Sequence, residues 1–298
     1  MQSQSLAESI QQLIKADKIH LPIHPAIVRQ VLEKSNTLEK TEQIKTLAGR
    51  DPALVCNLFR AANSSFFMGL KQTETLDDAI TRLGNERACQ VLEGACRENT
   101  NLGLGPLIPR YLPPLWQHSV GCAIGARWLA ERCGYQALAQ QAYLAGLLHD
   151  IGKLFLLASL EELAGRDHFN IPLSDQIVHE VMETMHVDQG LRLAGEWNLP
   201  ELFFTVIKRH HETTQDNQNI TLALVKLANK GCRKIGLGWQ QDRTLVLPTT
   251  AEAQFLGISE IALAEYEIML EDRFFDGTPG RPDRRVTSTS ANIVSAAT

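Results

Sequence analysis

The sequence has no excess of positive charge and few aromatic residues. Its 298 residues include 29 Lys and Arg against 34 Asp and Glu, a net charge of −5, and aromatic residues make up 6%. Surfaces that bind nucleic acid need clustered basic side chains, because the phosphate backbone dominates the affinity. The composition therefore argues against nucleic acid as a partner.

The sequence also has no Cys-x-x-Cys pair. Most of its cysteines stand among alanines and leucines, as small buried hydrophobic residues do. We therefore expect reduced thiols, as in a cytoplasm. The six are Cys56, Cys89, Cys96, Cys122, Cys133 and Cys232.

Export and membrane signals are likewise missing. Residues 1–18 are polar and contain acids where an export signal would have a basic and then an apolar segment. The longest apolar stretch, residues 142–160, is interrupted by His149, Asp150 and Lys153, which are costly in the middle of a bilayer. We expect a cytoplasmic protein without a membrane span, in which this stretch is a buried helix or a pair of helices.

Helical spacing of apolar residues dominates the chain, and alternating strand patterns are almost absent, which predicts an all-α fold. Two helix starts are clearly marked. Asp51 is suited to cap a helix with Pro52 at its first position. Thr75 and Asp78 form a capping box, and Gly84 is the expected stop.

The Gly- and Pro-rich residues 101–114 predict a break through which no helix runs undisturbed, and a subdomain boundary. We expect an N-terminal helical part at 1–105, a helical core at 106–235, and a helical extension at 236–275. Residues 276–298 lack a core pattern and are expected to be a disordered tail.

The extension contains one amphipathic segment, ISEIALAEYEIMLEDRFF. Its spacing is typical of a closing helix with one face on the core. The apolar positions that suit this helix are Ile261, Leu263, Tyr266, Ile268, Met269 and Leu270.

Histidines are concentrated in the core segment, where residues 115–231 hold seven of the nine. A metal site on helices needs imidazoles and carboxylates that several helices direct to one point. A single buried histidine is most often structural, but candidates from four helical segments together favour a metal site. These candidates are His118, His149, Asp150, His186, His210 and His211.

Two alternatives to metal binding stay open. The His149-Asp150 pair interrupts a helix that is otherwise apolar, and a buried charge needs a partner or a metal. Lys153, one helical turn further on, is near enough to neutralise Asp150 without a metal. His210 and His211 point about 100° apart on a helix, so one of them can be buried and the other solvated.

The remaining histidines have no such company. We expect them to be surface or loop residues, and we expect Met182 and Met185 to fill the core. The four histidines are His20, His24, His168 and His179.

Several segments, spread in order over roughly residues 15–230, together resemble an HDOD domain. The resemblance implies an all-α helical bundle in which an N-terminal helical subdomain packs on a core like that of the HD phosphohydrolases. It also implies bacterial signal transduction, in a family where many members have no demonstrated enzymatic activity. The segments are LPIHPAIVRQVL, DPALVCNLFRAANSSFF, TLDDAITRLG, LWQHSVGCAIGARWLA, AGLLHDIGKLFL, HVDQGLRLAGEWNLP and VIKRHHE, and the second and third are hallmarks of HDOD domains.

The catalytic relatives of this family, such as the HD-GYP phosphodiesterases that cut cyclic di-GMP, hold two or more metals. The resemblance implies one or two divalent ions here (Fe, Mn, Ni or Zn), and Asp150 and Lys153 as catalytic residues if the site is active. Carried over by position, the implied ligands are His118, the HD pair His149 and Asp150, His186, and the pair His210 and His211, with Lys153 as the lysine after the HD pair.

Three departures weaken the enzymatic expectation. Asn229 stands where the relatives have a late aspartate, and its neutral amide is a weaker ligand. The Gly-Tyr-Pro signature is missing after His211, and Pro114 replaces a further carboxylate. We therefore expect a non-catalytic output module that acts on signalling proteins in trans, including components of cyclic-dinucleotide pathways. The alternative is a metal-dependent phosphohydrolase that acts on a nucleotide or a cyclic dinucleotide.

Overall fold

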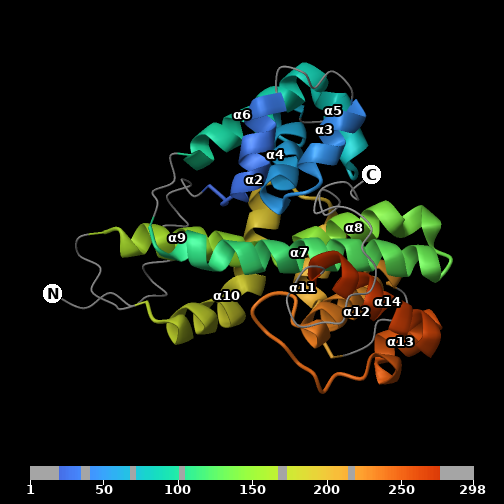
Figure 1. The fold of residues 1–298 in the computed structure, drawn as a ribbon. Helices are drawn as coiled ribbons and strands as arrows, with labels where there is room; N and C mark the ends of the chain where they lie inside the picture. The colour runs from blue at the N-terminus through green and yellow to red at the C-terminus, as the bar shows by residue number, and fades with distance from the viewer. Residues whose placement is uncertain are drawn as a thin grey trace.

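The fold consists of packed helices. A computed structural model describes residues 20–34, 41–67, 72–100, 105–166, 173–213 and 219–275, and regular structure within these ranges is entirely helical. The all-α prediction is confirmed. The N-terminal helices, which lie together above the long core helices in Figure 1, are α2 (Pro25–Lys34), α3 (Thr41–Ala48), α4 (Pro52–Ala62), the short η2 (Ser65–Phe67), α5 (Leu76–Leu83) and α6 (Asn85–Thr100).

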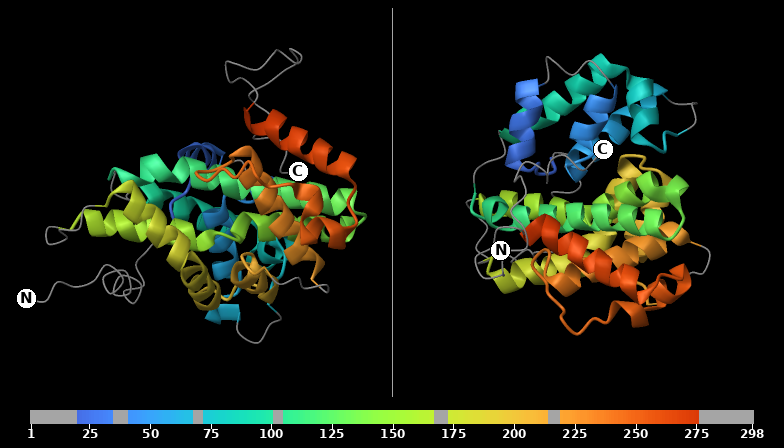
Figure 2. Two further views of the ribbon diagram at one scale, coloured as in Figure 1. Left: turned by 90° about the horizontal axis from the view of Figure 1, so that it is seen from below. Right: turned by 45° about the vertical axis from the view of Figure 1, so that its right-hand side comes forward.

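The core is built around one long helix, α7. Helices α8, α9 and α12 pack against α7, and α10 packs against α9, so that the chain returns repeatedly to the same central layer (Figures 1 and 2). The core elements are α7 (Leu107–Arg132), η3 (Gln136–Leu138), α8 (Ala139–Leu148), α9 (Ile151–Ala164), α10 (Asp175–Glu196), α11 (Glu201–Arg209), α12 (Ile220–Ile235), η4 (Leu247–Thr249), α13 (Ala251–Leu256) and α14 (Glu260–Phe275).

Both marked helix starts are confirmed. Asp51 has extended backbone and accepts hydrogen bonds from the first backbone N–H groups of α4, and Pro52 begins the helix. Thr75 accepts a hydrogen bond from the N–H of Asp78 at the start of α5. Gly84 ends α5 with a φ of +74°, a value that favours glycine.

The prediction that no helix runs through residues 101–114 is wrong from Leu107 onward. Helix α7 begins there and contains Pro113 and Pro114 in its interior. Each proline removes one helical hydrogen bond. Burial of the apolar side chains in this stretch, Tyr111 among them, offsets that loss, because packing overrides local preference.

The apolar stretch at residues 142–160 was expected to be one buried helix or a pair of helices, and it is a pair, α8 and α9. Within the described part of the chain, residues 136–164 are long and apolar enough to cross a membrane, but their most apolar window is entirely buried inside the protein. Core helices have this property. The two helices meet at His149 and Asp150, which lie between the end of α8 and the start of α9.

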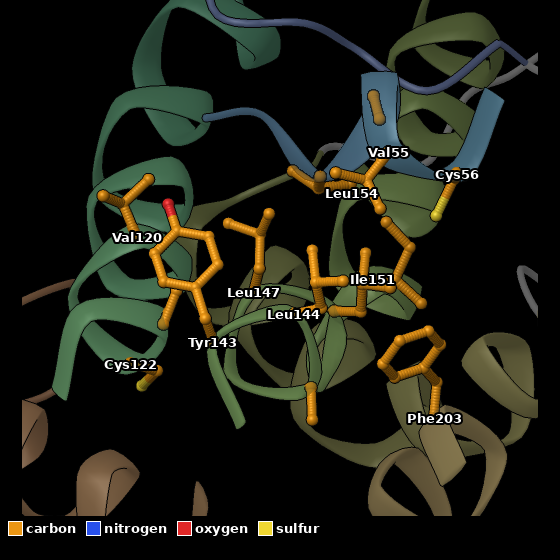
Figure 3. Close-up of a cluster of buried hydrophobic side chains, with 14 of the residues drawn as sticks. Val55, Cys56, Val120, Cys122, Tyr143, Leu144, Leu147, Ile151, Leu154 and Phe203 are labelled. Carbon is orange, nitrogen blue, oxygen red and sulfur yellow. The ribbon is translucent and has the colours of Figure 1, made fainter. Parts of the chain in front are cut away.

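The N-terminal helices pack directly on the core, as the resemblance implied. Figure 3 shows buried side chains of α4, α7, α8, α9 and α11 in one cluster. The Tyr143 hydroxyl donates to the Gly49 carbonyl at 3.1 Å, and the rings of Phe59 and Phe203 lie 5.6 Å apart. The subdomain boundary at residues 105–106 stays a prediction.

The closing helix is present as α14, but its expected apolar face is only partly correct. Leu263, Tyr266 and Leu270 are buried, whereas Ile261 is 73% exposed and Ile268 is 49% exposed. These two residues are seven positions apart and lie on a different side of the helix from the buried ones. The apolar face of α14 is therefore wider than the part that packs on the core. The predicted tail, residues 276–298, lies outside the described residues.

The Asp51 cap is also a buried acid with its own pH dependence. One carboxylate oxygen accepts from the N–H of His24 at 3.0 Å and the other from the N–H of Ala53 at 2.9 Å. Burial raises the pKa of Asp51 to about 6, and these hydrogen bonds oppose the shift only in part. The folded protein therefore binds a proton at Asp51 more tightly than the unfolded chain does.

We predict that this acid makes the protein lose stability as the pH rises from about 4 to about 6. A difference of about two pKa units corresponds to about 3 kcal/mol across that window. Asp51→Asn should remove this component and add a constant loss of about 1 kcal/mol, because the His24 N–H loses its acceptor. Urea unfolding of both proteins with a chelator, at several pH values, measures the difference, and parallel pH curves would contradict the prediction.

Candidate metal centre

The structure brings all six candidate ligands into one cluster, in which the histidines surround the carboxylate of Asp150. They come from four places in the fold: the middle of α7, the α8–α9 junction, α10, and the end of α11. His149, Asp150, His186 and His210 are buried, with exposures of 0 to 4%, while His211 is exposed. Of the two alternatives for the histidine pair, one buried and one exposed residue is observed, yet both reach the same cluster.

Close helix crossings make this convergence possible. A side chain at Gly152 of α9 would place its Cβ 1.9 Å from the carbonyl oxygen of His186 on α10. At Gly146 of α8 the Cβ would lie 2.6 Å from the carbonyl oxygen of Cys122 on α7. The backbones therefore touch on both sides of Asp150, and short His side chains from α7 and α10 can reach it.

Four of the five histidine rings are held in one orientation by backbone carbonyls. A carbonyl oxygen can only accept, so in each ring Nδ1 carries the proton and Nε2 presents its lone pair to the cluster. Such contacts typically orient histidine ligands of metals. The donors and acceptors are His118 to Leu237 at 3.0 Å, His149 to Gly146 at 2.7 Å, His186 to Met182 at 2.7 Å, and His210 to Ile207 at 2.9 Å.

The first candidate position, called position 1, consists of Asp150 Oδ1 and the Nε2 atoms of His186, His210 and His211. Oδ1 lies 3.5 Å from His186 and 3.3 Å from His210, and the His186 and His210 nitrogens are 3.4 Å apart. A tetrahedral ion with bonds of about 2.0 to 2.1 Å has ligand atoms about 3.3 Å apart. The donor set therefore fits such an ion.

Two further observations at position 1 support this fit. Within the described residues Asp150 Oδ1 is buried and has no hydrogen-bond partner, since the nearby imidazole nitrogens carry no proton. The Nε2 atoms of His186 and His211 lie 2.9 Å apart, so a proton or a cation has to separate their lone pairs.

The second candidate position, called position 2, faces the other carboxylate oxygen. Asp150 Oδ2 lies 3.6 Å from His118 Nε2 and 3.4 Å from His149 Nε2. His149 is fully buried, and its Nε2 has no hydrogen-bond partner among the described residues. Three donors thus surround a second point, and one carboxylate serves both positions.

The salt bridge anticipated from the sequence is also present. Lys153 Nζ lies 2.9 Å from Asp150 Oδ2 and 3.1 Å from Glu183 Oε1 on α10. Burial lowers the pKa of Lys153, but the two carboxylates outweigh it and raise the pKa overall. Burial raises the pKa of Asp150, yet the ammonium group of Lys153 holds it well below its usual range. Both groups are charged.

Glu183 was missed by the sequence reasoning. It lies three residues before His186 on α10 and therefore on the same helical face, which is the signal that could have identified it. Its carboxylate holds the side of Lys153 that Asp150 does not contact.

His118, His149, His186 and His211 are neutral, as metal ligands must be. Burial lowers the pKa of His118 and His186, and it lowers that of His149 well below the usual value. Burial, followed by the neighbouring His210, lowers the pKa of His211 to about 4. Their nitrogens are available to a cation at neutral pH.

The cluster faces a pocket, and Asn229 of α12 is buried in the wall of that pocket. Its amide is neutral, so it brings no charge to the site. The pocket, into which the cluster faces, is also lined by His118, Asp150, Lys153, Glu183, His211, Arg233, Leu237, Trp239 and Gln240, with Pro114 and Leu115 beside them.

The other histidines lie away from the cluster, but one interpretation needs correction. His20 is exposed and pairs with a glutamate, and His24 is a half-buried loop residue. His179, expected to be a surface or loop residue, is half-buried on α10. Its ring lies 4.6 Å from the ring of Trp239, which belongs to a loop distant in the sequence. His168 lies outside the described residues.

Comparison with known proteins identifies relatives of this fold. The chain is 28% identical over 201 residues to an uncharacterized protein of Treponema pallidum (strain Nichols), covering 63% of this chain and 37% of the other. The chain thus spans little more than a third of that relative's length.

Two solved structures share the fold. The MmoQ response regulator from Methylococcus capsulatus (strain Bath) is 18% identical with a TM-score of 0.64, over 83% of this chain and 97% of the other. A virulence factor from Campylobacter jejuni is 15% identical with a TM-score of 0.56, over 88% and 97% of the two chains. The family model of the HDOD domain matches residues 21–213, well over half of the sequence, and the chain belongs to this family.

Proposed function

We propose that the protein is a signalling output module whose core holds one or two divalent metal ions and whose effect passes through partner proteins in trans. The metal part rests on one observation: five imidazoles, four of them oriented by backbone carbonyls, stand in two sets around the two buried oxygens of Asp150. When bound, such ions supply Lewis acidity and fixed positive charge.

The burial of the site supports an output role without turnover. Asp150 is 4% exposed, His149 is 0% exposed and Lys153 is 7% exposed, so a phosphoester has little access to the atoms that would act on it. Lys153 is already neutralised by two carboxylates. Asn229 adds no negative charge to offset a second dication.

Family membership and fold support a place in signalling. The chain belongs to the HDOD family, and MmoQ, a response regulator by name, has the same fold. Partners that fit this role are signalling proteins in trans, including components of cyclic-dinucleotide pathways. Imidazole-rich donor sets suit Fe, Mn, Ni or Zn.

One observation favours a metal-dependent phosphohydrolase as the second candidate. The pocket that contains Asp150 is also lined by Lys153, Arg233 and Trp239. Two cations and an indole ring are groups that recognise the phosphate and the base of a nucleotide or a cyclic dinucleotide. In that case Asp150 would hold the ions and Lys153 would orient the phosphate.

Metal analysis together with activity assays distinguishes the two. We expect protein purified without chelator to contain between one and two equivalents of transition metal. We expect it to show no turnover of nucleotide or cyclic-dinucleotide phosphoesters when Mn, Fe or Ni is added, and to form a stoichiometric complex with a defined signalling protein.

Other results would overturn the proposal. Protein that binds no metal, even after reconstitution, would contradict the metal centre. Robust turnover that is lost in Lys153→Met would establish the phosphohydrolase instead.

A further inference from the structure

A thiol lies beside position 2. Cys122 is one helical turn after His118 on α7, and its Sγ lies 3.6 Å from His118 Nε2. The ligand atoms of His118, Cys122 and His149 all lie within 4.8 Å of one another. The sequence interpretation of Cys122 as a buried residue is correct, but burial here places its sulfur against two imidazoles.

Three of the ligand-to-ligand distances have the values of a tetrahedral site that includes sulfur. With metal–nitrogen bonds of about 2.0 Å and a metal–sulfur bond of about 2.3 Å, nitrogen and sulfur ligands lie about 3.5 Å apart. The observed separation is 3.6 Å, and the edges from Asp150 Oδ2 to His118 and to His149 are 3.6 and 3.4 Å. His149 Nε2, fully buried and without a hydrogen-bond partner among the described residues, is a second mark of a ligand at this point.

We propose that Cys122 supplies the fourth donor of position 2, forming a site of two histidines, one aspartate and one cysteine. Such a set favours thiophilic divalent ions, with Zn²⁺ as the natural occupant, over Mn²⁺ or Mg²⁺. The proposal rests on the metal centre of the proposed function and specifies the chemistry of one of its two positions.

Charge gives this assignment its physical reason. At position 2 the only carboxylate is that of Asp150, and the buried Asn229 in the wall of the same pocket is neutral, so one negative charge faces a dication there. When the metal–sulfur bond forms, the thiol S–H bond breaks and its proton passes to solvent. The thiolate and Asp150 then balance a dication within the same shell.

A neighbouring thiol provides a matched control. Cys232 on α12 is buried beside Cys122, whereas it does not belong to the group formed with His118 and His149. A purely structural thiol pair would make the two cysteines equivalent. A metal ligand makes only Cys122 essential.

Cobalt reconstitution of the full chain tests the assignment. Metal-free protein is titrated with Co²⁺, and the thiolate-to-cobalt charge-transfer band in the near ultraviolet is recorded for wild type, Cys122→Ser and Cys232→Ser. We expect the band in wild type and in Cys232→Ser. We expect Cys122→Ser to lose it and to bind the ion at position 2 at least about tenfold more weakly, with position 1 unchanged.

The possible results distinguish a failure of this inference from a failure of the proposed function. Wild type that binds cobalt without the charge-transfer band overturns the role of Cys122 and leaves the metal centre intact. A band that persists in Cys122→Ser also overturns it. Wild type that binds no cobalt, zinc or manganese overturns both. Circular dichroism of the metal-free variants shows whether each one is folded.

Discussion

Replacement of Asp150 by alanine is expected to abolish metal binding at both positions and to lower the free energy of unfolding of the metal-free protein by about 3 kcal/mol. Each carboxylate oxygen belongs to a different position, so one substitution removes a ligand from both. It also leaves Lys153 buried with only Glu183 to neutralise it. Metal analysis and urea unfolding measure the two losses separately.

The double variant Asp150→Ala with Lys153→Met is the control for charge. Because it no longer buries an ammonium group that has lost one of its two carboxylates, it should recover more than half of the lost stability. It should still bind no metal. An Asp150→Ala protein that retains two equivalents of metal would contradict the shared role of this carboxylate.

Gly152→Ala is expected to lower the free energy of unfolding by about 3 kcal/mol or more. The new Cβ would lie 1.9 Å from the His186 carbonyl oxygen and 2.8 Å from the Gly190 nitrogen. Both are backbone atoms, so α9 and α10 have to move apart. Asp150 precedes α9 and His186 lies on α10, so a movement of these helices would shift both ligands, and metal affinity at position 1 should fall as well.

Gly195→Ala on α10 is the matched control. Gly195 is exposed, and an added Cβ there meets no atom within 4 Å. Alanine in an open helical position stabilises by about 0.5 to 1 kcal/mol, so this variant should be slightly more stable, with unchanged metal binding. Equal effects of the two substitutions would show that the close crossing is unimportant.

Features that depend on a few neighbouring residues could be predicted from the sequence. Asp51 and Thr75 cap their helices because the groups they bind lie two or three residues away. The predicted break at residues 101–114 was wrong from Leu107 onward, since burial of Tyr111 and its neighbours against distant helices outweighs the two internal prolines. Local patterns carry no information on that packing.

The candidate site shows the same division. The convergence of the six ligand candidates agrees with the sequence interpretation, although their role as ligands stays a prediction. Glu183 and Cys122 each lie one helical turn from a ligand candidate, His186 and His118, so helical spacing is the signal that could have drawn attention to them. The carbonyl of Leu237, which orients His118 from 119 residues away, has no sequence signal.

Because Lys153 pairs with Asp150, the protein can fold before it binds a metal ion. Small zinc domains stay unfolded until the ion arrives, because metal binding supplies their folding free energy. Here an ammonium group of the chain itself provides the positive charge, and the helices can close first. If an ion bound at position 2, Glu183 would still neutralise Lys153, whose ammonium group lies 3.1 Å from its carboxylate. Occupancy of the centre would therefore follow the supply of metal in the cell and not the synthesis of the chain.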